Sequence, residues 1–231
     1  MVRFRGVGAI ADRIIDVMAT TEPVVGFVSG SHYADSIPAI VDELRLRGKN
    51  PTVVYNTGGY DSVETLRRLE PYVDIYLPDF KYSNATLAGD LSHAPDYPVR
   101  AGEALVEMFR QKGSALRIDD EGLAFGGIVI RHLVLPGMVE NSLRCLDWIA
   151  ENLSTNLHLS IMSQYYPPDF FLASDYFKRH PQSPLARRVT QEEYDIVVEH
   201  FYSLGFHNGW IQELDSARSY RPDFSTDSPF M

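Results

Sequence analysis

The sequence from position 73 to position 81 reads VDIYLPDFK, and this stretch decides the fold class. Its apolar residues alternate with a period of two, which predicts a β-strand with one buried face. Asp79 and Lys81 continue the same alternation, so we expect both charged side chains to point the same way at the end of the strand. Ligands of α/β proteins bind outside the carboxyl ends of the strands. Asp79 and Lys81 are therefore candidate binding residues.

On either side of this stretch, short apolar runs alternate with amphipathic segments. The apolar runs predict strands at 24–29, 52–56, 73–79, 127–135, 157–163 and 209–214. The amphipathic segments predict helices at 35–48, 62–69, 97–112, 140–153 and 190–204, of which the last is opened by a capping box. A tight turn predicts a small hairpin at 115–125. Strands joined by helical crossovers indicate an α/β fold with a parallel sheet or barrel.

The domain organisation is expected to be simple. No linker or internal repeat divides the sequence, so residues 1–231 are predicted to form one domain. Residues 164–189 are rich in Tyr, Phe, Pro and Ser with weak periodicity, which favours a loop over the carboxyl end of the sheet. Residues 215–231 are expected to be a polar tail.

Further polar residues lie inside or at the ends of the predicted strands. Arg131 lies within an apolar strand, where a charge must be paired or must hold a ligand. Gln164 continues the polar face of the strand at 157–163, and Asn56 ends the second strand. Ser29 and His32 follow the end of the first strand. These residues indicate a ligand site, and the alternative for Asp79, Lys81 and Arg131 is an ion-pair cluster that fills the barrel interior.

Composition excludes several classes of protein. The formal net charge is −10 and no basic stripe is visible, so nucleic-acid binding is not expected. No apolar run approaches the roughly 20 residues of a membrane span, and the first residues resemble no secretion signal, so we expect no membrane association and a cytoplasmic protein. The single cysteine, Cys145, excludes an intramolecular disulfide and any all-cysteine metal site, and no other metal site is predicted.

Four blocks of sequence carry a family resemblance. They read VYNTGGY at 54–60, DIYLPDFKY at 74–82, IRHLVLPG at 130–137 and MSQYYP at 162–167. In these blocks the chain resembles radical SAM proteins, specifically the group related to pyruvate formate-lyase activating enzyme. The resemblance implies a partial TIM-type (β/α) barrel, truncated at the N-terminus, that binds S-adenosylmethionine (SAM) across the carboxyl ends of its strands.

The resemblance also implies roles for individual residues. Asp79 and Lys81 match an Asp-x-Lys strand end that contacts the amino and carboxylate groups of the methionyl moiety. Arg131 matches an arginine near the same ligand. Asn56, Ser163 and Gln164 occupy matching strand ends with less defined roles. One anion beside at least one cation is also what a zwitterionic amino-acid group requires.

One feature of the family is missing from this sequence. The family holds a [4Fe–4S] cluster on a CxxxCxxC loop, and Cys145 matches none of those positions. We therefore expect no [4Fe–4S] cluster and no radical chemistry by this polypeptide alone. The first barrel strand is absent or reduced to residues 2–4, and a homodimer could cover the resulting open edge.

Three functions stay open at this point. The first is a SAM-dependent lyase or transferase with a small-molecule substrate, in which the sulfonium reacts by polar chemistry. Asp79 and Tyr165 are its candidate catalytic residues, with Tyr55, Tyr60 and Tyr166 as further candidates for a base or for a wall facing the cation. Its products would be methylthioadenosine or S-adenosylhomocysteine. The second is an inactive binding or regulatory protein, and the third is a barrel that binds an unrelated small anion.

Overall fold

The computed structural model describes residues 6–214. Within them the chain forms two compact units, which we call the first unit (6–78 and 100–129) and the second unit (79–99 and 130–214). Helix α5 (Tyr97–Lys112) and strand β5 (Ala124–Leu133) contribute residues to both. The single domain stays a prediction, and the expected polar tail and the remnant strand at 2–4 lie outside the described residues.

The strands of residues 6–214 form a seven-stranded sheet in the order β1-β2-β3-β5-β6-β7, and β4 pairs with β5 in antiparallel fashion. The pairs β1–β2, β2–β3 and β3–β5 are parallel, as are β6 and β7. The strands are β1 (Val24–Phe27), β2 (Thr52–Thr57), β3 (Ile75–Pro78), β4 (Arg117–Ile118), β5 (Ala124–Leu133), β6 (His158–Met162) and β7 (Gly209–Ile211). This arrangement confirms the predicted α/β class with a parallel sheet, and it is consistent with a partial TIM-type barrel.

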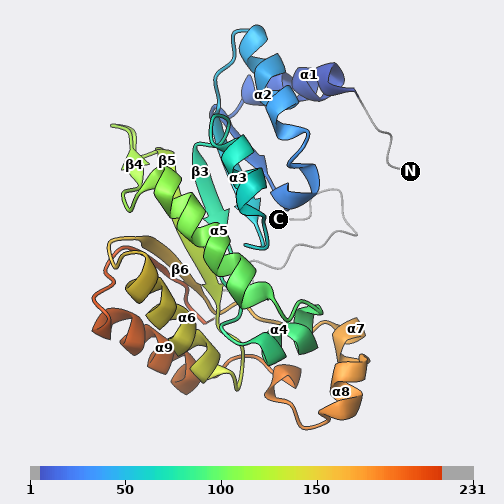
Figure 1. Ribbon diagram of the computed structural model, residues 1–231, viewed down its shortest axis with the longest axis vertical. Helices are drawn as coiled ribbons and strands as arrows, with labels where there is room; N and C mark the ends of the chain where they lie inside the picture. The colour runs from blue at the N-terminus through green and yellow to red at the C-terminus, as the bar shows by residue number, and fades with distance from the viewer. Residues whose placement is uncertain (1–5, 215–231) are drawn as a thin grey trace. The chain divides into compact units, whose positions relative to one another are not determined.

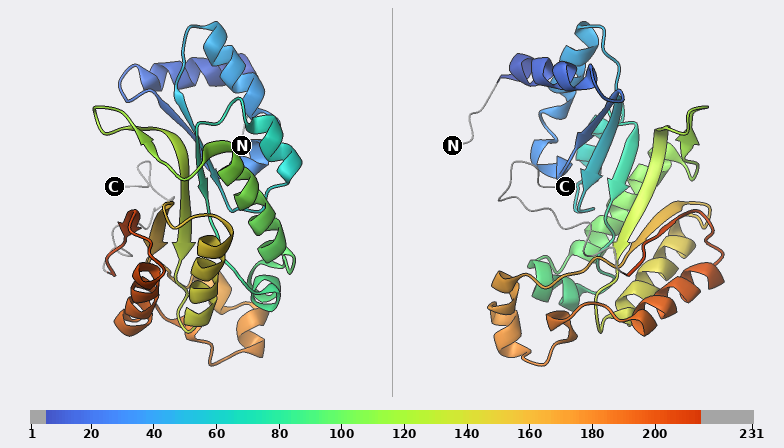
Figure 2. Two further views of the ribbon diagram at one scale, coloured as in Figure 1. Left: turned by 60° about the vertical axis from the view of Figure 1, so that its left-hand side comes forward. Right: turned by 180° about the vertical axis from the view of Figure 1, so that it is seen from behind.

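The first unit places helices beside its parallel strands. They are α1 (Val7–Met18), the 3-10 turn η1 (Gly30–Tyr33), α2 (Ile37–Leu46) and α3 (Val63–Leu69). Helix α1 packs against α2 (Figure 2), and Ala11, Ile40 and Leu44 share a buried cluster with Val25 of β1. No helix was predicted at α1 from the sequence, although the apolar residues of 7–18 recur at helical spacing.

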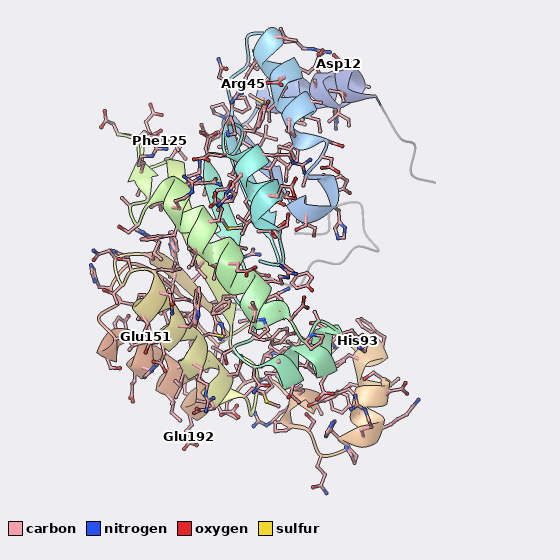
Figure 3. The ribbon with its side chains drawn as sticks, viewed as in Figure 1. Asp12, Arg45, His93, Phe125, Glu151 and Glu192 are labelled. Carbon is pink, nitrogen blue, oxygen red and sulfur yellow. The ribbon has the colours of Figure 1, made fainter. Side chains whose placement is uncertain are left out.

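The second unit contains the remaining helices. They are α4 (Ala85–Ser92), α6 (Val139–Asn152), α7 (Asp169–Leu172), α8 (Asp175–Arg179), the 3-10 turn η2 (Pro184–Ala186) and α9 (Gln191–Ser203). Helices α6 and α9 lie side by side (Figure 1). Glu151 of α6 and Glu192 of α9, labelled in Figure 3, are solvent exposed. The predicted capping box is confirmed, because Thr190 and Glu193 bond reciprocally at the start of α9.

The segment 164–189 differs from the expected loop. It contains α7, α8 and η2, which are too short to show a helical period in the sequence. Phe171, Tyr176 and Phe177 pack their rings together there, with centroids 5.0 to 5.7 Å apart. This aromatic packing stabilises helices that their own sequence does not specify.

Among residues 6–214, no helix combines the length and the apolar character that crossing a lipid bilayer requires.

Candidate functional site

A cavity of about 290 Å³ lies in the second unit, where β5 and β6 end. These two strands are neighbours in the sheet (Figure 2). The residues that line the cavity are Asp79, Lys81, Tyr82, Arg131, Leu133, Leu135, Met162 and Gln164. Four residues singled out from the sequence are thus brought together: Asp79, Lys81, Arg131 and Gln164.

The charged residues of the cavity form a connected cluster. Asp79 and Arg131 are joined by a parallel β-bridge, in which the Phe80 N–H donates to the Arg131 carbonyl oxygen at 2.9 Å. Arg131 donates from Nε at 2.8 Å and approaches with Nη2 at 2.6 Å, in both cases to Oδ1 of Asp79. The Lys81 Nζ lies 3.4 Å from Oδ2 of the same carboxylate. Two cations therefore share one anion, which leaves one positive charge in excess among the three side chains.

The three charged side chains differ in exposure. The Asp79 side chain is 17% exposed and that of Arg131 is 26% exposed, whereas that of Lys81 is 43% exposed. The close Asp79–Arg131 pair is thus the inner part of the cluster. Lys81 is held more loosely and reaches solvent, so a ligand can meet its ammonium group without breaking the inner pair.

Tyr97 holds the backbone on both sides of Phe80. Its hydroxyl donates to the Asp79 carbonyl oxygen at 2.8 Å and accepts from the Lys81 N–H at 3.0 Å. The Tyr97 side chain is buried, and burial raises the pKa of its hydroxyl, which therefore stays protonated and keeps both bonds. A single buried group at the start of α5 thus fixes the two candidate residues relative to each other.

His132 holds the carbonyl between them. The Phe80 carbonyl can only accept, so Nδ1 of His132 carries the proton of their 2.7 Å hydrogen bond. Nε2 then accepts from the Ser142 hydroxyl at 2.9 Å. His132 is fully buried, and this burial lowers its pKa, which keeps the ring in the neutral form that the network needs.

Asn141 of α6 completes the support of this segment. Its Nδ2 donates to the Lys81 carbonyl at 2.9 Å, and its Oδ1 accepts from the Ser83 N–H at 2.9 Å. Tyr97, His132 and Asn141 were not predicted from the sequence as supporting residues. The signal that could have found Asn141 is a polar side chain on the face of α6 that also carries Cys145 and Leu146.

Ser163 and Tyr165 lie close to Gln164 in sequence but do not line the cavity. The Ser163 hydroxyl donates to the Glu213 carbonyl at 2.8 Å. The Tyr165 hydroxyl donates to the Leu185 carbonyl at 2.8 Å, and burial raises its pKa to about 12. A phenol with a raised pKa stays protonated near neutral pH, and the catalytic role of Tyr165 stays a prediction.

Asn56, Ser29 and His32 belong to the first unit. Asn56 lies in β2, Ser29 adopts a left-handed conformation with φ of 54° before η1, and the His32 side chain is exposed. None of the three lines the cavity of the second unit. Their assignment to the ligand site stays a prediction.

The first unit has its own buried polar cluster around Asp61. The carboxylate of Asp61 accepts from the Tyr55 hydroxyl at 2.8 Å and from the hydroxyl of Thr57. Ser31 and Thr57 share a further hydrogen bond of 3.0 Å. The pKa of Tyr55 is raised, mainly by burial and to a smaller extent by the neighbouring Asp61. Tyr55 is thus a protonated donor in this cluster and not a ready base.

A [4Fe–4S] cluster does not fit the residues present. Such a cluster is held by several thiolates, and the sequence contains one cysteine. Cys145 is buried in α6, where burial raises the pKa of its thiol. Within residues 6–214, no group of three or more His, Cys, Asp and Glu side chains is placed to hold a metal ion.

Comparison with known proteins supports the fold. No family model matches the chain. An uncharacterized protein of Methanocaldococcus jannaschii is 31% identical over 180 residues, which cover 76% of this chain. The chain spans only 45% of the length of that relative.

A solved structure gives the second comparison. It is a domain of pyruvate-formate lyase-activating enzyme from Bacteroides vulgatus, which superposes with a TM-score of 0.55 at 12% sequence identity. The match covers 82% of this chain and 98% of that domain. At this identity the similarity establishes a shared fold, and it agrees with the resemblance found in the four sequence blocks.

Proposed function

We propose that the cavity of the second unit binds the amino-acid end of SAM, and that the protein uses SAM as a substrate in polar chemistry. The observation that carries this proposal is the cluster of Asp79 with two cations, Lys81 and Arg131, on the wall of one cavity. A zwitterionic α-amino acid group needs an acceptor for its ammonium group and donors for its carboxylate, side by side. The cluster supplies both kinds of partner.

The proposed pose follows from charge and size. Lys81 and Arg131 face the ligand carboxylate, Asp79 accepts from the ligand ammonium group, and Leu133 and Met162 lie beside the methylene chain. The cavity of about 290 Å³ is at the lower end of small-molecule sites, which span roughly 300–1,000 Å³. It therefore suits the amino-acid end of SAM and not the entire molecule.

The proposed chemistry requires no electron transfer. The sulfonium is a good leaving group, so a nucleophile can form a bond to the methyl carbon while the S–CH₃ electron pair stays on sulfur, which gives S-adenosylhomocysteine. Attack on, or cyclisation of, the aminocarboxypropyl chain would break the S–C bond to that chain, leave its electron pair on sulfur and give methylthioadenosine. In either case the contribution of these residues is to hold the amino-acid end in a fixed position.

A second candidate function has support in the same cluster. Its excess positive charge suits any small carboxylate or other anion, with Lys81 and Arg131 as the anchors. Binding of a simple anion together with no binding of SAM would favour this candidate. A third candidate, an inactive SAM-binding protein, would bind SAM but release neither methylthioadenosine nor S-adenosylhomocysteine when the incubation is analysed by chromatography.

Calorimetry with SAM and methylthioadenosine tests the proposal. Lys81→Ala is expected to weaken SAM by about 30-fold, near the lower end for a truncated charge contact because Lys81 is partly exposed. Methylthioadenosine lacks the amino-acid end, so its affinity is expected to change little. Lys178→Ala is the matched control, because Lys178 forms an exposed ion pair with Asp175.

The ion-pair alternative predicts a different pattern. If Lys81 only stabilises the fold, Lys81→Ala will lower the melting temperature and leave the affinity of the folded protein for SAM unchanged. Equal affinities of the wild type and Lys81→Ala for SAM would therefore refute the proposed pose.

A further inference from the structure

A chain of hydrogen bonds runs from the backbone directly after β6 to Gln164, which lines the cavity. It begins at the Ser163 N–H, which donates to Oε1 of Gln212 at 2.9 Å. Nε2 of Gln212 then donates to Oε1 of Gln164 at 3.1 Å. Because a backbone N–H can only donate, the first bond fixes which end of the Gln212 amide is oxygen, and the second bond fixes the Gln164 amide in turn.

This order determines what Gln164 offers to a ligand. Its oxygen accepts from Gln212, so its Nε2 is the end left for other partners. That nitrogen lies 3.8 Å from the Met162 sulfur, a weak acceptor. Within residues 6–214 it makes no other hydrogen bond. Gln164 is thus oriented as a donor and lines the same cavity as Lys81 and Arg131.

We propose that Gln212 is a positioning residue that presents the Gln164 amide as a hydrogen-bond donor to the carboxylate of the bound ligand. The proposal rests on the proposed function and deepens it, because it assigns the carboxylate as the group that the cavity selects. Three donors, Lys81, Arg131 and Gln164, then face an acceptor-rich group. A ligand whose carboxylate is missing would leave these donors without a partner.

The position of Gln212 is itself well fixed. Its N–H donates to the Ile161 carbonyl at 3.0 Å, directly after the register pair Ile161–Ile211 of β6 and β7. The parallel ladder thus sets the backbone from which the Gln212 side chain extends. A substitution of its side chain can therefore change the hydrogen-bond direction without removing a backbone pairing.

Gln212→Glu tests this inference. The introduced carboxylate can still accept from the Ser163 N–H, but it cannot donate to Gln164, so the Gln164 amide is expected to turn and bring its oxygen to the cavity. Loss of a donor to a charged group is expected to weaken SAM by about 10- to 100-fold. Methylthioadenosine is expected to bind as it does to the wild type, and thermal melting checks that the variant is folded.

The double variant Gln164→Leu/Gln212→Glu separates this effect from the added negative charge. If Gln212 acts through Gln164, Gln212→Glu will have little further effect in the Gln164→Leu background. If Gln212→Glu causes the same loss of SAM affinity in both backgrounds, the loss is a charge effect and the inference is overturned. An unchanged affinity of Gln212→Glu for SAM would also overturn the inference. Both results leave the proposed function intact. Absence of SAM binding by the wild type would overturn both.

A measurement on the wild-type protein gives a second test, which does not depend on whether a variant folds. The side-chain amide protons of Gln164 are expected to shift in the NMR spectrum and to exchange more slowly with solvent when SAM binds. Unchanged Gln164 amide signals at saturating SAM would contradict the inference.

Discussion

Replacing Tyr97 by phenylalanine is expected to loosen the segment that carries Asp79 and Lys81. The substitution removes one hydroxyl, and with it both the bond to the Asp79 carbonyl and the bond from the Lys81 N–H. The other hydrogen bonds of this segment involve different groups: the Phe80 N–H and carbonyl are held by Arg131 and His132, and the Lys81 carbonyl is held by Asn141. They therefore do not replace the two bonds of Tyr97.

The expected cost follows from burial. The Tyr97 side chain is 4% exposed, so its loss leaves two backbone groups without a partner in a poorly solvated place. Each unsatisfied buried group costs about 1–3 kcal/mol. Solvent that enters through the cavity partly compensates the two groups, so the expected loss in the free energy of unfolding is about 2–4 kcal/mol. For a protein of this size, such a loss lowers the melting temperature by roughly 4–16 °C.

Denaturant unfolding followed by circular dichroism provides the assay, with Tyr176→Phe as the matched control. Tyr176 is 8% exposed, and its hydroxyl shares one hydrogen bond with Ser183. The control is expected to lose about 0.5–1.5 kcal/mol. If Tyr97→Phe costs no more than Tyr176→Phe, the segment is held by its other contacts and the reasoning about Tyr97 is refuted.

Two further predictions concern pH and backbone geometry. Burial lowers the folded-state pKa of His132 below its ordinary 6.5, so the free energy of unfolding should be constant above pH 6.5 and fall as the pH drops below it. Urea unfolding at several pH values from about 7.5 to about 5.5 measures how the free energy of unfolding changes with pH. If the wild type and His132→Asn show the same change with pH, the prediction for His132 is wrong. Gly209→Ala should destabilise the protein by about 2–4 kcal/mol, because φ is +125° and an added Cβ would lie 1.8 Å from the Leu159 carbonyl oxygen. Gly205→Ala, at φ +88° with open space around it, isolates the cost of the backbone conformation, and equal losses in the two variants would exclude the clash.

Local sequence patterns were sufficient to predict most of the fold. The period-two runs located β1, β2, β3, β5 and β6 to within a few residues, and the predicted bounds of α5 match the structure. The capping box at 190–193 placed the start of α9 correctly. These signals are reliable because strand alternation and helix capping depend on residues close together in the chain.

Two helices, α1 and α4, were missed although the sequence carries a local signal for each. Gly6 and Gly8 weaken the helical pattern at the start of α1, and burial against α2 and β1 stabilises this helix. Helix α4 was also missed, and its first turn is capped by Asn84, which accepts from the Thr86 and Leu87 N–H groups. In α1 the low helix propensity of glycine is offset by packing, whereas in α4 a local cap fixes the start of a short helix.

The residues of the candidate site were likewise predicted only in part from the sequence. Strand parity was enough to place Asp79 and Lys81 on one side, and the rule that buried charges are paired pointed to Arg131. Neither rule could reveal Tyr97 or Gln212, which reach the site from segments distant in sequence. Their hydrogen bonds depend on the register of α5 and β7 relative to the site, which no local pattern encodes.

The charge balance of the cluster favours a ligand over a purely structural ion pair. Arg131 alone already satisfies Oδ1 of Asp79 through two nitrogens, so the fold gains little from a second cation. Lys81, at 3.4 Å and partly exposed, is the kind of ion pair that contributes at most about 1 kcal/mol. Lys81 lines the same cavity as Leu133 and Met162, so an arriving carboxylate would meet its ammonium group there. The small contribution of the second cation to the fold supports the proposal that Lys81 meets a ligand carboxylate.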